Sequence, residues 1–149
     1  MKIYADTSFL VSLLYPGDSQ HQSSRNFFSQ FQTDEWITSP WAMFETANSL
    51  RQLCLKARGP RPTTIEAIRR QFKHWHTHGA FTTAGTEMNE AVIESQQLSA
   101  TLSAQMKMRS ADVLHVALLE QITPDLFVTR DKDQHALAVN RAFKSRLLP

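Results

Sequence analysis

The stretch IYADTSFLVSLL, residues 3–14, decides the architecture of the chain, because an apolar strand runs directly into an apolar helix. Residues 1–5 are predicted to form a short strand, and residues 8–15 a helix that follows after almost no loop. Asp6 therefore falls at the carboxyl end of a strand. A strand that passes at once into a helix is typical of the repeating unit of α/β folds.

Strands and helices alternate along the rest of the sequence. Further strands are predicted at residues 35–38 (EWIT), 80–83 and 126–129 (LFVT), with a weak edge-strand signal at 145–148. Apolar periodicity predicts helices at residues 19–32, 40–57, 63–78, 86–106, 111–121 and 134–143. The uninterrupted run LFVT is typical of a strand buried in a parallel sheet. This alternation predicts an α/β sandwich.

Three helix ends carry chemical signals. Ser39 followed by Pro40 is predicted to form the N-cap and first position of the helix at 40–57. Gly79 is predicted to end the helix at 63–78 in the left-handed conformation, and Ser110 to cap the helix at 111–121. Glu45 then lies in a second helical turn, and Asp112 in a first turn.

Length and composition favour one compact domain spanning residues 1–149, since 42% of the residues are hydrophobic and can bury a core. Cys54 is the only cysteine, which excludes an intramolecular disulfide and a cysteine-based zinc cage and favours a reducing compartment. The apolar run at 7–17 is too short to span a bilayer, and Asp6 interrupts any signal-peptide core. We expect a cytoplasmic protein without membrane contact.

The positive charge is concentrated in one region. The net charge of +2 permits nucleic-acid binding without requiring it. Between residues 51 and 73 seven basic side chains face a single acid, Glu66: they are Arg51, Lys56, Arg58, Arg61, Arg69, Arg70 and Lys73. A solvated helix face is the alternative explanation of this cluster.

Acidic residues stand where a parallel α/β fold would gather them. The four glycines lack the spacing of a Walker loop, a dinucleotide fingerprint or a nucleophile elbow. Asp6 and Asp131 end strands, whereas Glu45 and Asp112 lie early in helices. Strand carboxyl ends and helix amino ends share one edge of the sheet, where such folds bind ligands. All four acids could converge there, although each one alone is often just a helix cap.

Convergence of these carboxylates requires a counter-ion. Two carboxylates about 4 Å apart repel by roughly 4 kcal/mol at an effective dielectric constant of 20. A divalent cation removes this repulsion, and all-oxygen ligation suits Mg²⁺ or Mn²⁺. Such an ion can polarise a phosphoryl oxygen and activate water.

Four segments in order resemble the PIN-domain family: IYADTSFLVSLL around Asp6, PWAMFETANSL around Glu45, SADVLHVALL around Asp112 and FVTRDKDQHALA around Asp131. More narrowly, they look like the VapC-type ribonuclease toxins of toxin-antitoxin modules. The resemblance implies a three-layer PIN-like fold, with a central, mainly parallel sheet of four to five strands flanked by helices. It also implies a Mg²⁺ or Mn²⁺ site, endonucleolytic RNA cleavage, a homodimer, and a small antitoxin whose tail covers the acidic pocket.

Residue by residue, Asp6, Glu45, Asp112 and Asp131 match the acidic quartet of that family, and all four are expected to serve catalysis and metal binding. Asp6 and Asp112 look like the surest direct ligands. The matching hydroxyl positions are Thr7, Ser8 and Thr129, whose expected work is to orient Asp6 and a water molecule. The final segment, VNRAFKSRLLP, departs from the pattern, since many relatives return to the last strand through a glycine.

Several other residues have two interpretations. Asp133 could be a fifth acid, although a surface cap is favoured, and His115 could face the pocket, although a packed or orienting histidine is favoured. Basic side chains flank the acids and could contact RNA phosphates or be solvated: Arg109, Arg130 and Lys132. The tract HWHTH suggests zinc only superficially, because no third ligand is near. Trp36, Trp41 and Trp75 are expected to pack rather than stack on bases.

The leading hypothesis is a metal-dependent endoribonuclease of the toxin type that hydrolyses RNA with activated water. The first alternative is a non-catalytic RNA-binding or regulatory module on the same fold. The second is a phosphotransfer enzyme or receiver-like domain with Asp6 as nucleophile. Neither fits well, because Ser8 stands where the haloacid-dehalogenase pattern needs a second aspartate, and a receiver needs an acidic pair near the first strand and a late lysine after a strand.

Overall fold

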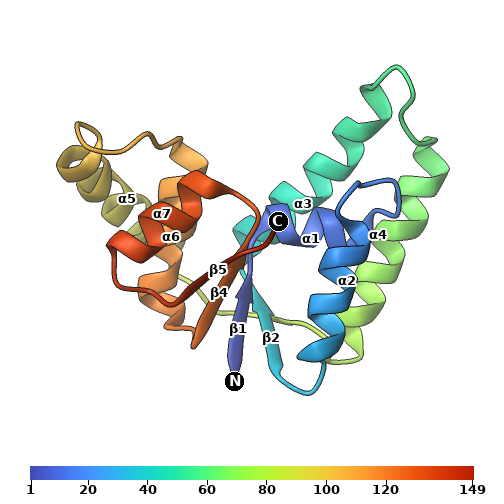
Figure 1. The fold of residues 1–149 in the computed structure, drawn as a ribbon, viewed down its shortest axis with the longest axis horizontal. Coiled ribbons are helices and arrows are strands. Elements are labelled where there is room, and N and C mark those ends of the chain that lie inside the picture. The colour runs from blue at the N-terminus through green and yellow to red at the C-terminus, as the bar shows by residue number, and fades with distance from the viewer.

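A five-stranded sheet forms the centre of the computed structural model, which describes all residues, 1–149 (Figure 1). Its strands are β1 (Lys2–Ala5), β2 (Glu35–Thr38), β3 (Thr82–Thr83), β4 (Leu126–Thr129) and β5 (Ser145–Leu147). They follow the order β3-β2-β1-β4-β5, and each neighbouring pair is parallel. The predicted parallel sheet of four to five strands is confirmed.

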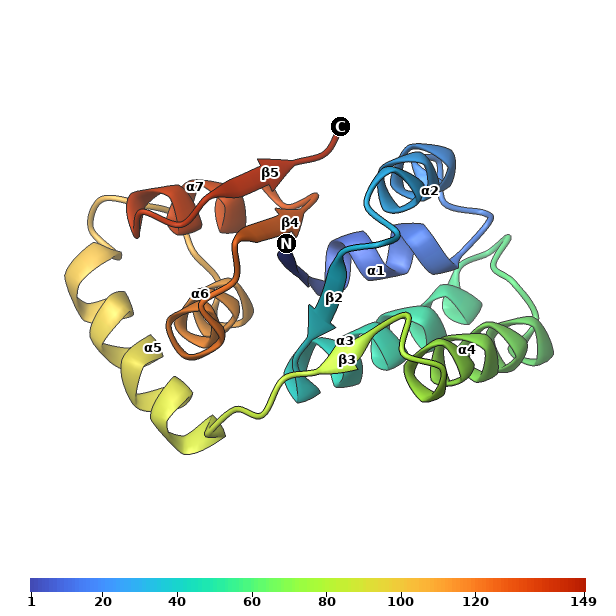
Figure 2. The same ribbon diagram turned by 90° about the horizontal axis from the view of Figure 1, so that it is seen from below.

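Helices cover both faces of the sheet. They are α1 (Thr7–Leu14), α2 (His21–Gln30), α3 (Pro40–Gln52), the short 3₁₀ helix η1 (Leu53–Leu55), α4 (Pro62–Thr77), α5 (Met88–Leu102), α6 (Ser110–Ile122) and α7 (Lys132–Asn140). Figure 2 shows α1 to α4 on one side of the strands and α5 to α7 on the other. The three-layer α/β prediction is therefore correct. None of these helices combines the length and the apolar character needed to cross a bilayer.

Strand β1 lies in the middle of the sheet and pairs on both sides. Ile3 is in register with Trp36 of β2 and with Leu126 of β4. The side chains of Ile3, Tyr4 and Ala5 are fully buried. Because β1 has neighbours at both edges and helices on both faces, it must be apolar throughout, as parallel strands generally are. This position places Asp6, the next residue, at the carboxyl edge of the sheet.

The core on the α1 to α4 side is built around Trp36. The indole is 2% exposed and stacks on Phe9 with the ring centroids 5.3 Å apart. Its Nε1–H donates to the carbonyl oxygen of Phe31 at 2.9 Å, which satisfies the one polar group of the side chain. Phe28 and Phe81 pack against the same ring at 5.0 and 5.7 Å. Trp36 is thus a core residue, in accord with the prediction of packing.

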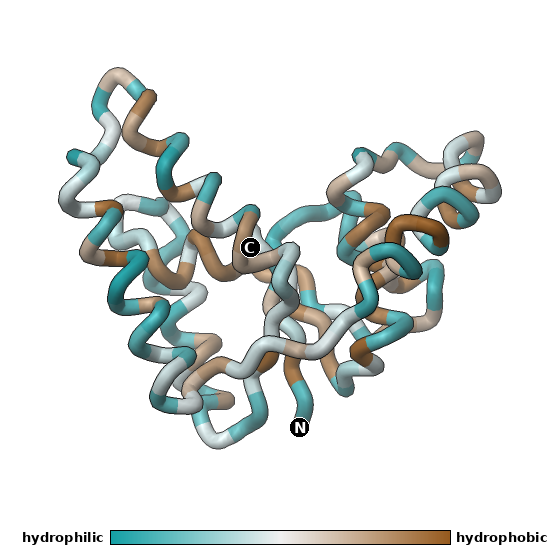
Figure 3. The backbone as a smooth tube through the Cα atoms, turned by 180° about the vertical axis from the view of Figure 1, so that it is seen from behind, coloured by the Kyte–Doolittle hydropathy of each residue, from teal (hydrophilic) through white to brown (hydrophobic).

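The core on the other side is built around α6. Along this helix Val116, Leu118 and Leu119 are fully buried, and Phe127 of β4 stacks on Tyr4 of β1 beneath it at 5.8 Å. In Figure 3 hydrophobic and hydrophilic residues alternate along the outer helices, the pattern of amphipathic helices on a sheet. Since α6 is buried on nearly all sides, its amino end is held rigidly.

Capping groups explain where the helix boundaries differ from prediction. Gly79 has the predicted left-handed conformation, with φ of 77°. Ser110 is not the N-cap of α6, so that prediction is wrong: Arg109 takes this place, and its backbone N–H donates to Asp112 Oδ2 at 3.0 Å. Helix α7 starts at Lys132, two residues earlier than predicted, because the Asp131 carboxylate caps it.

Strand β5 forms without the glycine that many PIN relatives use in this return. Ala142 adopts the left-handed conformation instead, with φ of 63°. For a residue with a Cβ this conformation costs about 1–2 kcal/mol. The backbone N–H of Ala142 donates to the carbonyl of Val139 and that of Phe143 to the carbonyl of Ala138, both at 2.9 Å, and these bonds hold the turn. The chain then reaches the edge of the sheet beside β4.

Candidate active site

A pocket of about 360 Å³ opens at the carboxyl edge of the sheet. Four helices contribute its lining: Thr7, Ser8 and Val11 of α1, Glu45 and Ser49 of α3, Arg109, Ala111 and Asp112 at the start of α6, and Asp131 and Gln134 at the start of α7. Glu45, Asp112 and Asp131 of the predicted quartet face this pocket. The fourth acid, Asp6, lies behind Ser8 and does not line it.

Asp6 is fully buried and its carboxylate is fully hydrogen-bonded. It caps α1, accepting the backbone N–H of Phe9 on Oδ1 at 2.8 Å. The Ser8 hydroxyl lies 2.9 Å from Oδ1 and 2.8 Å from Oδ2. Thr129 Oγ1 donates to Oδ2 at 2.7 Å. Donors of the chain thus occupy both carboxylate oxygens of Asp6.

The two hydroxyls also connect Asp6 to the turn between β4 and α7. Ser8 Oγ accepts the backbone N–H of Arg130 at 2.8 Å, and Thr129 Oγ1 accepts that of Asp131 at 2.9 Å. Each hydroxyl therefore donates to Asp6 and accepts from the backbone that carries Asp131. Thr7, the third predicted hydroxyl, turns away from Asp6 and bonds Glu45.

Burial raises the pKa of Asp6, although the nearby His115, the Phe9 N–H and the hydroxyls of Thr129 and Ser8 oppose the shift. A raised native pKa means that the native state binds more protons than the unfolded state above the ordinary aspartate value of about 3.9. The free energy of unfolding contributed by Asp6 should therefore fall as the pH rises from about 4 through its native pKa.

Urea denaturation of the wild type and of Asp6→Asn in EDTA, between pH 4 and 8, measures this contribution. We expect the stability of the wild type relative to the variant to decrease with pH, because asparagine does not titrate. A relative stability that stays constant or increases over this range contradicts the assignment.

Three carboxylates lie close together at the amino ends of α6 and α7. Asp112, Asp131 and Asp133 each offer one oxygen within 4.8 Å of the other two. Asp131 caps α7 through Oδ1, which accepts the N–H groups of Asp133 and Gln134 at 2.8 and 3.1 Å. Its Oδ2 accepts a hydrogen bond from Arg109 Nη2 at 2.9 Å. The helix amino termini favour negative charge at both positions.

Arg109 supplies positive charge to this cluster. Its Nη2 lies 2.9 Å from Asp131 Oδ2, and its Nε lies 3.3 Å from Asp112 Oδ2. The charges of Asp112 and then Asp131 raise the pKa of the guanidinium. The side chain is 67% exposed, so it can leave the carboxylates without disturbing the core. Arg109 is the one predicted RNA-contact residue that lines the acidic pocket.

The donor set fits a divalent cation of the hard type. Beside the three carboxylates, Gln134 is 6% exposed and donates Nε2–H to Asp112 Oδ1 at 3.2 Å. Because this bond fixes the orientation of the amide, its oxygen Oε1 is left buried and without a partner in the chain. An unpartnered amide oxygen beside carboxylates suits Mg²⁺ or Mn²⁺, which prefer oxygen ligands. The sequence pattern does not single out Gln134, although it lies three residues after Asp131.

Glu45 enters the pocket from α3, and two hydrogen bonds fix its carboxylate. Its Oε2 accepts hydrogen bonds from Thr7 Oγ1 at 2.8 Å and from His115 Nε2 at 2.7 Å. Burial alone would raise the pKa of Glu45, but the hydrogen bond and charge of His115 and the hydroxyl of Thr7 outweigh it and lower the pKa. Glu45 is therefore a carboxylate at neutral pH.

Arg130 and Lys132 lie outside the acidic pocket and border a separate hollow next to β5. The Arg130 guanidinium donates to Ser24 Oγ at 3.3 Å and to the carbonyl oxygen of Pro149. Its partial burial lowers the pKa of this arginine. The geometry gives Arg130 a bracing role between β4 and α2, and a contact with RNA remains a prediction for both residues.

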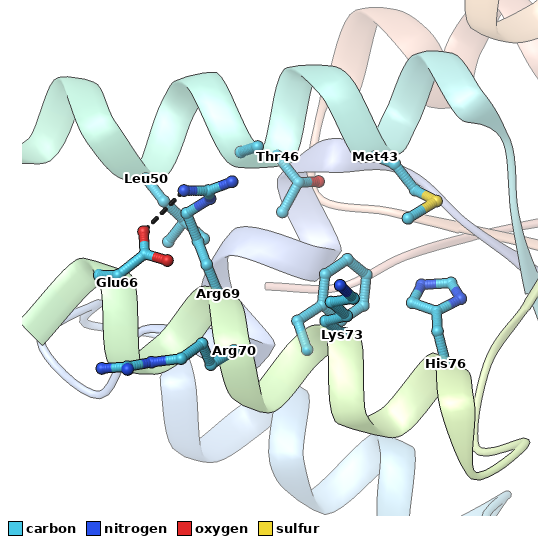
Figure 4. Close-up of a pocket in the computed structure, with 10 residues that line it drawn as sticks. Met43, Thr46, Leu50, Glu66, Arg69, Arg70, Lys73 and His76 are labelled. Carbon is cyan, nitrogen blue, oxygen red and sulfur yellow. Dashed lines mark hydrogen bonds and ion pairs between the residues drawn. The ribbon is translucent and has the colours of Figure 1, made fainter.

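The largest hollow lies between α3 and α4, on the other side of α3 from the acidic pocket. Figure 4 shows this groove of about 480 Å³, with Thr46 and Leu50 on one wall and Arg69, Lys73 and His76 on the other. Its single carboxylate, Glu66, is paired with Arg69 at 2.7 Å. The groove therefore has three basic side chains of the predicted cationic region, Arg69, Arg70 and Lys73, but no set of metal ligands.

The histidine tract does not assemble a zinc site. His74 and His78 stack with their ring centroids 3.8 Å apart, whereas His76 points to the α3–α4 groove (Figure 4). Asp112, Asp131 and Asp133 are the one group in the chain that could hold a metal.

Solved structures with this fold cover nearly the whole chain. VapC20 of Mycobacterium tuberculosis, a sarcin-ricin loop cleaving toxin, matches with a TM-score of 0.64 and 18% identity over 90% of this chain and 93% of its own. FitAcB from Neisseria gonorrhoeae matches with a TM-score of 0.63 and 12% identity, over 96% of this chain and 95% of its own. DNA-bound VapBC from Salmonella typhimurium matches with a TM-score of 0.64 and 12% identity, over 98% of this chain and 97% of its own.

Sequence comparison identifies the family. No curated protein matches the sequence. At 12–18% identity the three structures show a shared fold and no more. The family model described as the PIN domain, however, matches residues 3–140, which include all four acids of the predicted quartet. The chain therefore belongs to the PIN domain family.

Proposed function

We propose that this chain is a Mg²⁺- or Mn²⁺-dependent endoribonuclease and the toxin of a toxin-antitoxin pair. The observation that carries the proposal is the cluster of Asp112, Asp131 and Asp133 around an unpartnered oxygen of Gln134, in a pocket that Glu45 also enters. This cluster has the hard oxygen donors that phosphodiester hydrolysis with a divalent cation requires.

In this proposal Asp112 and Asp131 hold the cation, and Asp133 and Gln134 offer further oxygen atoms. Asp6 joins them when the Ser8 hydroxyl turns aside, and otherwise fixes the β4–α7 turn through Ser8 and Thr129. The bound cation supplies Lewis-acid charge at the scissile phosphate. Glu45 accepts a proton from, or orients, the attacking water.

RNA and a small antitoxin are the proposed partners, and a homodimer in the cytoplasm is the proposed form. VapC20, which shares the fold, is a sarcin-ricin loop cleaving toxin, and VapBC from Salmonella is bound to DNA. The mildly basic chain with a pI of 8.9 is compatible with an RNA substrate. Arg109 lies at the mouth of the pocket, where an RNA phosphate would enter.

The decisive experiment is cleavage of total cellular RNA by the purified protein with Mg²⁺ or Mn²⁺, followed by mapping of the new RNA ends. Asp6→Asn expressed in cells should relieve growth inhibition by the wild type. If the protein cuts no cellular RNA and Asp6→Asn relieves no inhibition, the catalytic proposal is wrong. Metal-independent RNA binding without turnover would instead identify a non-catalytic RNA-binding module.

Arg109→Ala is expected to change metal binding and RNA binding in opposite directions. Removal of the guanidinium frees Asp112 and Asp131 from a competing cation, so Mn²⁺ should bind roughly two- to fivefold more tightly, the scale of exposed ion pairs. RNA binding should weaken because a cation near the phosphate is lost. Calorimetric Mn²⁺ titration without RNA and RNA fluorescence anisotropy in EDTA measure the two effects.

Arg141→Ala is the matched control, since Arg141 pairs with Glu120 of α6 at 2.9 Å, remote from the pocket. This variant should leave both affinities unchanged. Weaker Mn²⁺ binding by Arg109→Ala would contradict competition and indicate that the guanidinium supports the ion site.

A further inference from the structure

We infer that His115 is a positioning residue that holds Glu45 with one carboxylate oxygen, Oε1, available to the pocket. This inference deepens the proposed function and rests on it for its kinetic consequence. Both hydrogen bonds to Glu45 end on the same oxygen: Thr7 Oγ1 and His115 Nε2 reach Oε2 at 2.8 and 2.7 Å. No donor of the chain bonds Oε1, so Glu45 acts through a single, fixed oxygen.

His115 is itself held by a buried chain of hydrogen bonds. The imidazole is fully buried, and its Nδ1 lies 3.2 Å from the Tyr4 hydroxyl. That hydroxyl lies 2.8 Å from Ser39 Oγ, which accepts the backbone N–H of Ala42 at 3.1 Å. Burial raises the pKa of Tyr4, so the phenol stays neutral and remains a hydrogen-bonding partner. Both ring nitrogens of His115 are therefore engaged, and the ring cannot rotate without breaking a buried bond.

The chain of bonds closes on the helix that carries Glu45. Ser39 is the N-cap of α3, and Glu45 lies in the second turn of the same helix. Tyr4 of β1 and His115 of α6 therefore connect two points of α3, which are the N-cap Ser39 and the carboxylate of Glu45. This closed arrangement fixes α3 and the Glu45 carboxylate together against the sheet.

His115 also places Glu45 relative to the carboxylate cluster. Asp112 and His115 are three residues apart on α6 and lie on one face of that helix. Asp112 turns to Gln134 and Arg109, whereas His115 turns to Glu45. Because α6 is buried along most of its length, the two contacts keep a constant separation. The two halves of the acidic site are thus held by one rigid helix.

The geometry excludes His115 as a general base acting directly on a substrate. It is fully buried and does not line the pocket, and its Nε2 is occupied by Glu45. Its effect on the reaction must pass through the Glu45 carboxylate. Misplacement of a reacting group by about 1 Å can lower the rate roughly a hundredfold. Loss of the Nε2 contact should therefore lower kcat and leave RNA binding unchanged.

Two amide substitutions separate the two ring nitrogens. His115→Gln keeps an N–H near the position of Nε2, and His115→Asn keeps one near Nδ1 and loses the contact with Glu45. We expect kcat for RNA cleavage to fall about a hundredfold in His115→Asn and only a few-fold in His115→Gln, with KM unchanged in both. Equal losses in both variants, or a change confined to KM, would overturn the positioning role.

Thr7→Val provides a second variant at a partly exposed site, in case the buried substitutions disturb the fold. It removes the other donor to Oε2 and should lower kcat, with a circular dichroism spectrum and Tm close to those of the wild type. Tyr4→Phe breaks the support of His115 and should give an intermediate loss. An unchanged kcat in both would show that Glu45 needs no fixed orientation.

Crystal structures of the histidine variants test the inference independently of catalysis. In His115→Gln the Glu45 carboxylate should keep its rotamer, whereas in His115→Asn it should be disordered or turned. If the wild type cuts no RNA, the proposed function fails, but this comparison still decides whether His115 positions Glu45. An ordered, unmoved Glu45 in His115→Asn would overturn the inference even in an active nuclease.

Discussion

Asp112→Asn is expected to lower RNA cleavage by about a thousandfold or more, with a small effect on the fold. Asp112 is 3% exposed and is bonded to Arg109 and Gln134, so it is the one buried carboxylate of the cluster. In the proposed function its charge stabilises a divalent cation, and a thousandfold loss corresponds to about 4 kcal/mol of transition-state stabilisation. The measurement is the rate of cleavage of a defined RNA at saturating Mg²⁺ and Mn²⁺.

The asparagine variant separates catalysis from folding. Its amide oxygen can still accept the backbone N–H of Arg109, the bond by which Asp112 holds the start of α6. Glu120→Gln, at an exposed position near the other end of the same helix, should cleave RNA at the wild-type rate. Near-normal cleavage by Asp112→Asn at saturating metal would show that the cluster is a structural helix cap and that the chemistry lies elsewhere.

Trp36→Ala is expected to lower the free energy of unfolding by about 3–5 kcal/mol, the cost of emptying the site of a large buried aromatic side chain. Trp36 is 2% exposed and stacks on Phe9. Its Nε1–H donates to the carbonyl oxygen of Phe31, and the alanine variant would leave this oxygen without its partner. Since domains of this size have total stabilities of about 5–15 kcal/mol, this loss removes between about a fifth and all of the stability. Urea denaturation followed by circular dichroism measures the loss.

Two variants show whether the loss comes from the cavity. Phe44→Ala removes an aromatic side chain that is 61% exposed, and it should change the stability by less than about 0.5 kcal/mol. Trp36→Phe keeps part of the stack and should lose less than Trp36→Ala. A loss below about 1 kcal/mol in Trp36→Ala would contradict the assignment of this residue to the centre of the core.

The strands and the edge of the sheet that carries the site are largely predictable from the sequence, for a physical reason. A parallel strand buried on both faces must be apolar throughout, and a run such as LFVT at 126–129 is compatible with few other structural environments. Once those strands are placed, chain order puts Asp6 and Asp131 at their carboxyl ends. Glu45 and Asp112 follow from the helix starts predicted at residues 40 and 111, the second of which lies one residue after the observed start. The positions of the acids thus depend on short-range patterns.

The contacts within the site depend on long-range packing and cannot be predicted in this way. The residues around Asp6 do not themselves show that Thr129 will donate to it, and only the resemblance to the PIN-domain family points to that hydroxyl. The unpartnered oxygen of Gln134 follows from a bond to Asp112, 22 residues earlier in the chain. The prediction of helix ends fails for a related reason, because an unexpected residue such as Asp131 can cap the helix and move its start.

The central place of β1 in the sheet has a consequence for the timing of synthesis. Ile3 pairs with Leu126, so strand β1 can form this side of its pairing only after β4, a much later segment of the chain, has been synthesised. Pairing between such distant segments is intrinsically slow to form. The carboxylates of Asp112 and Asp131 likewise come together only after α6, β4 and the start of α7 have been synthesised. A nascent chain held on the ribosome before that point has no assembled acidic pocket, so the proposed nuclease would be inactive while it is being made.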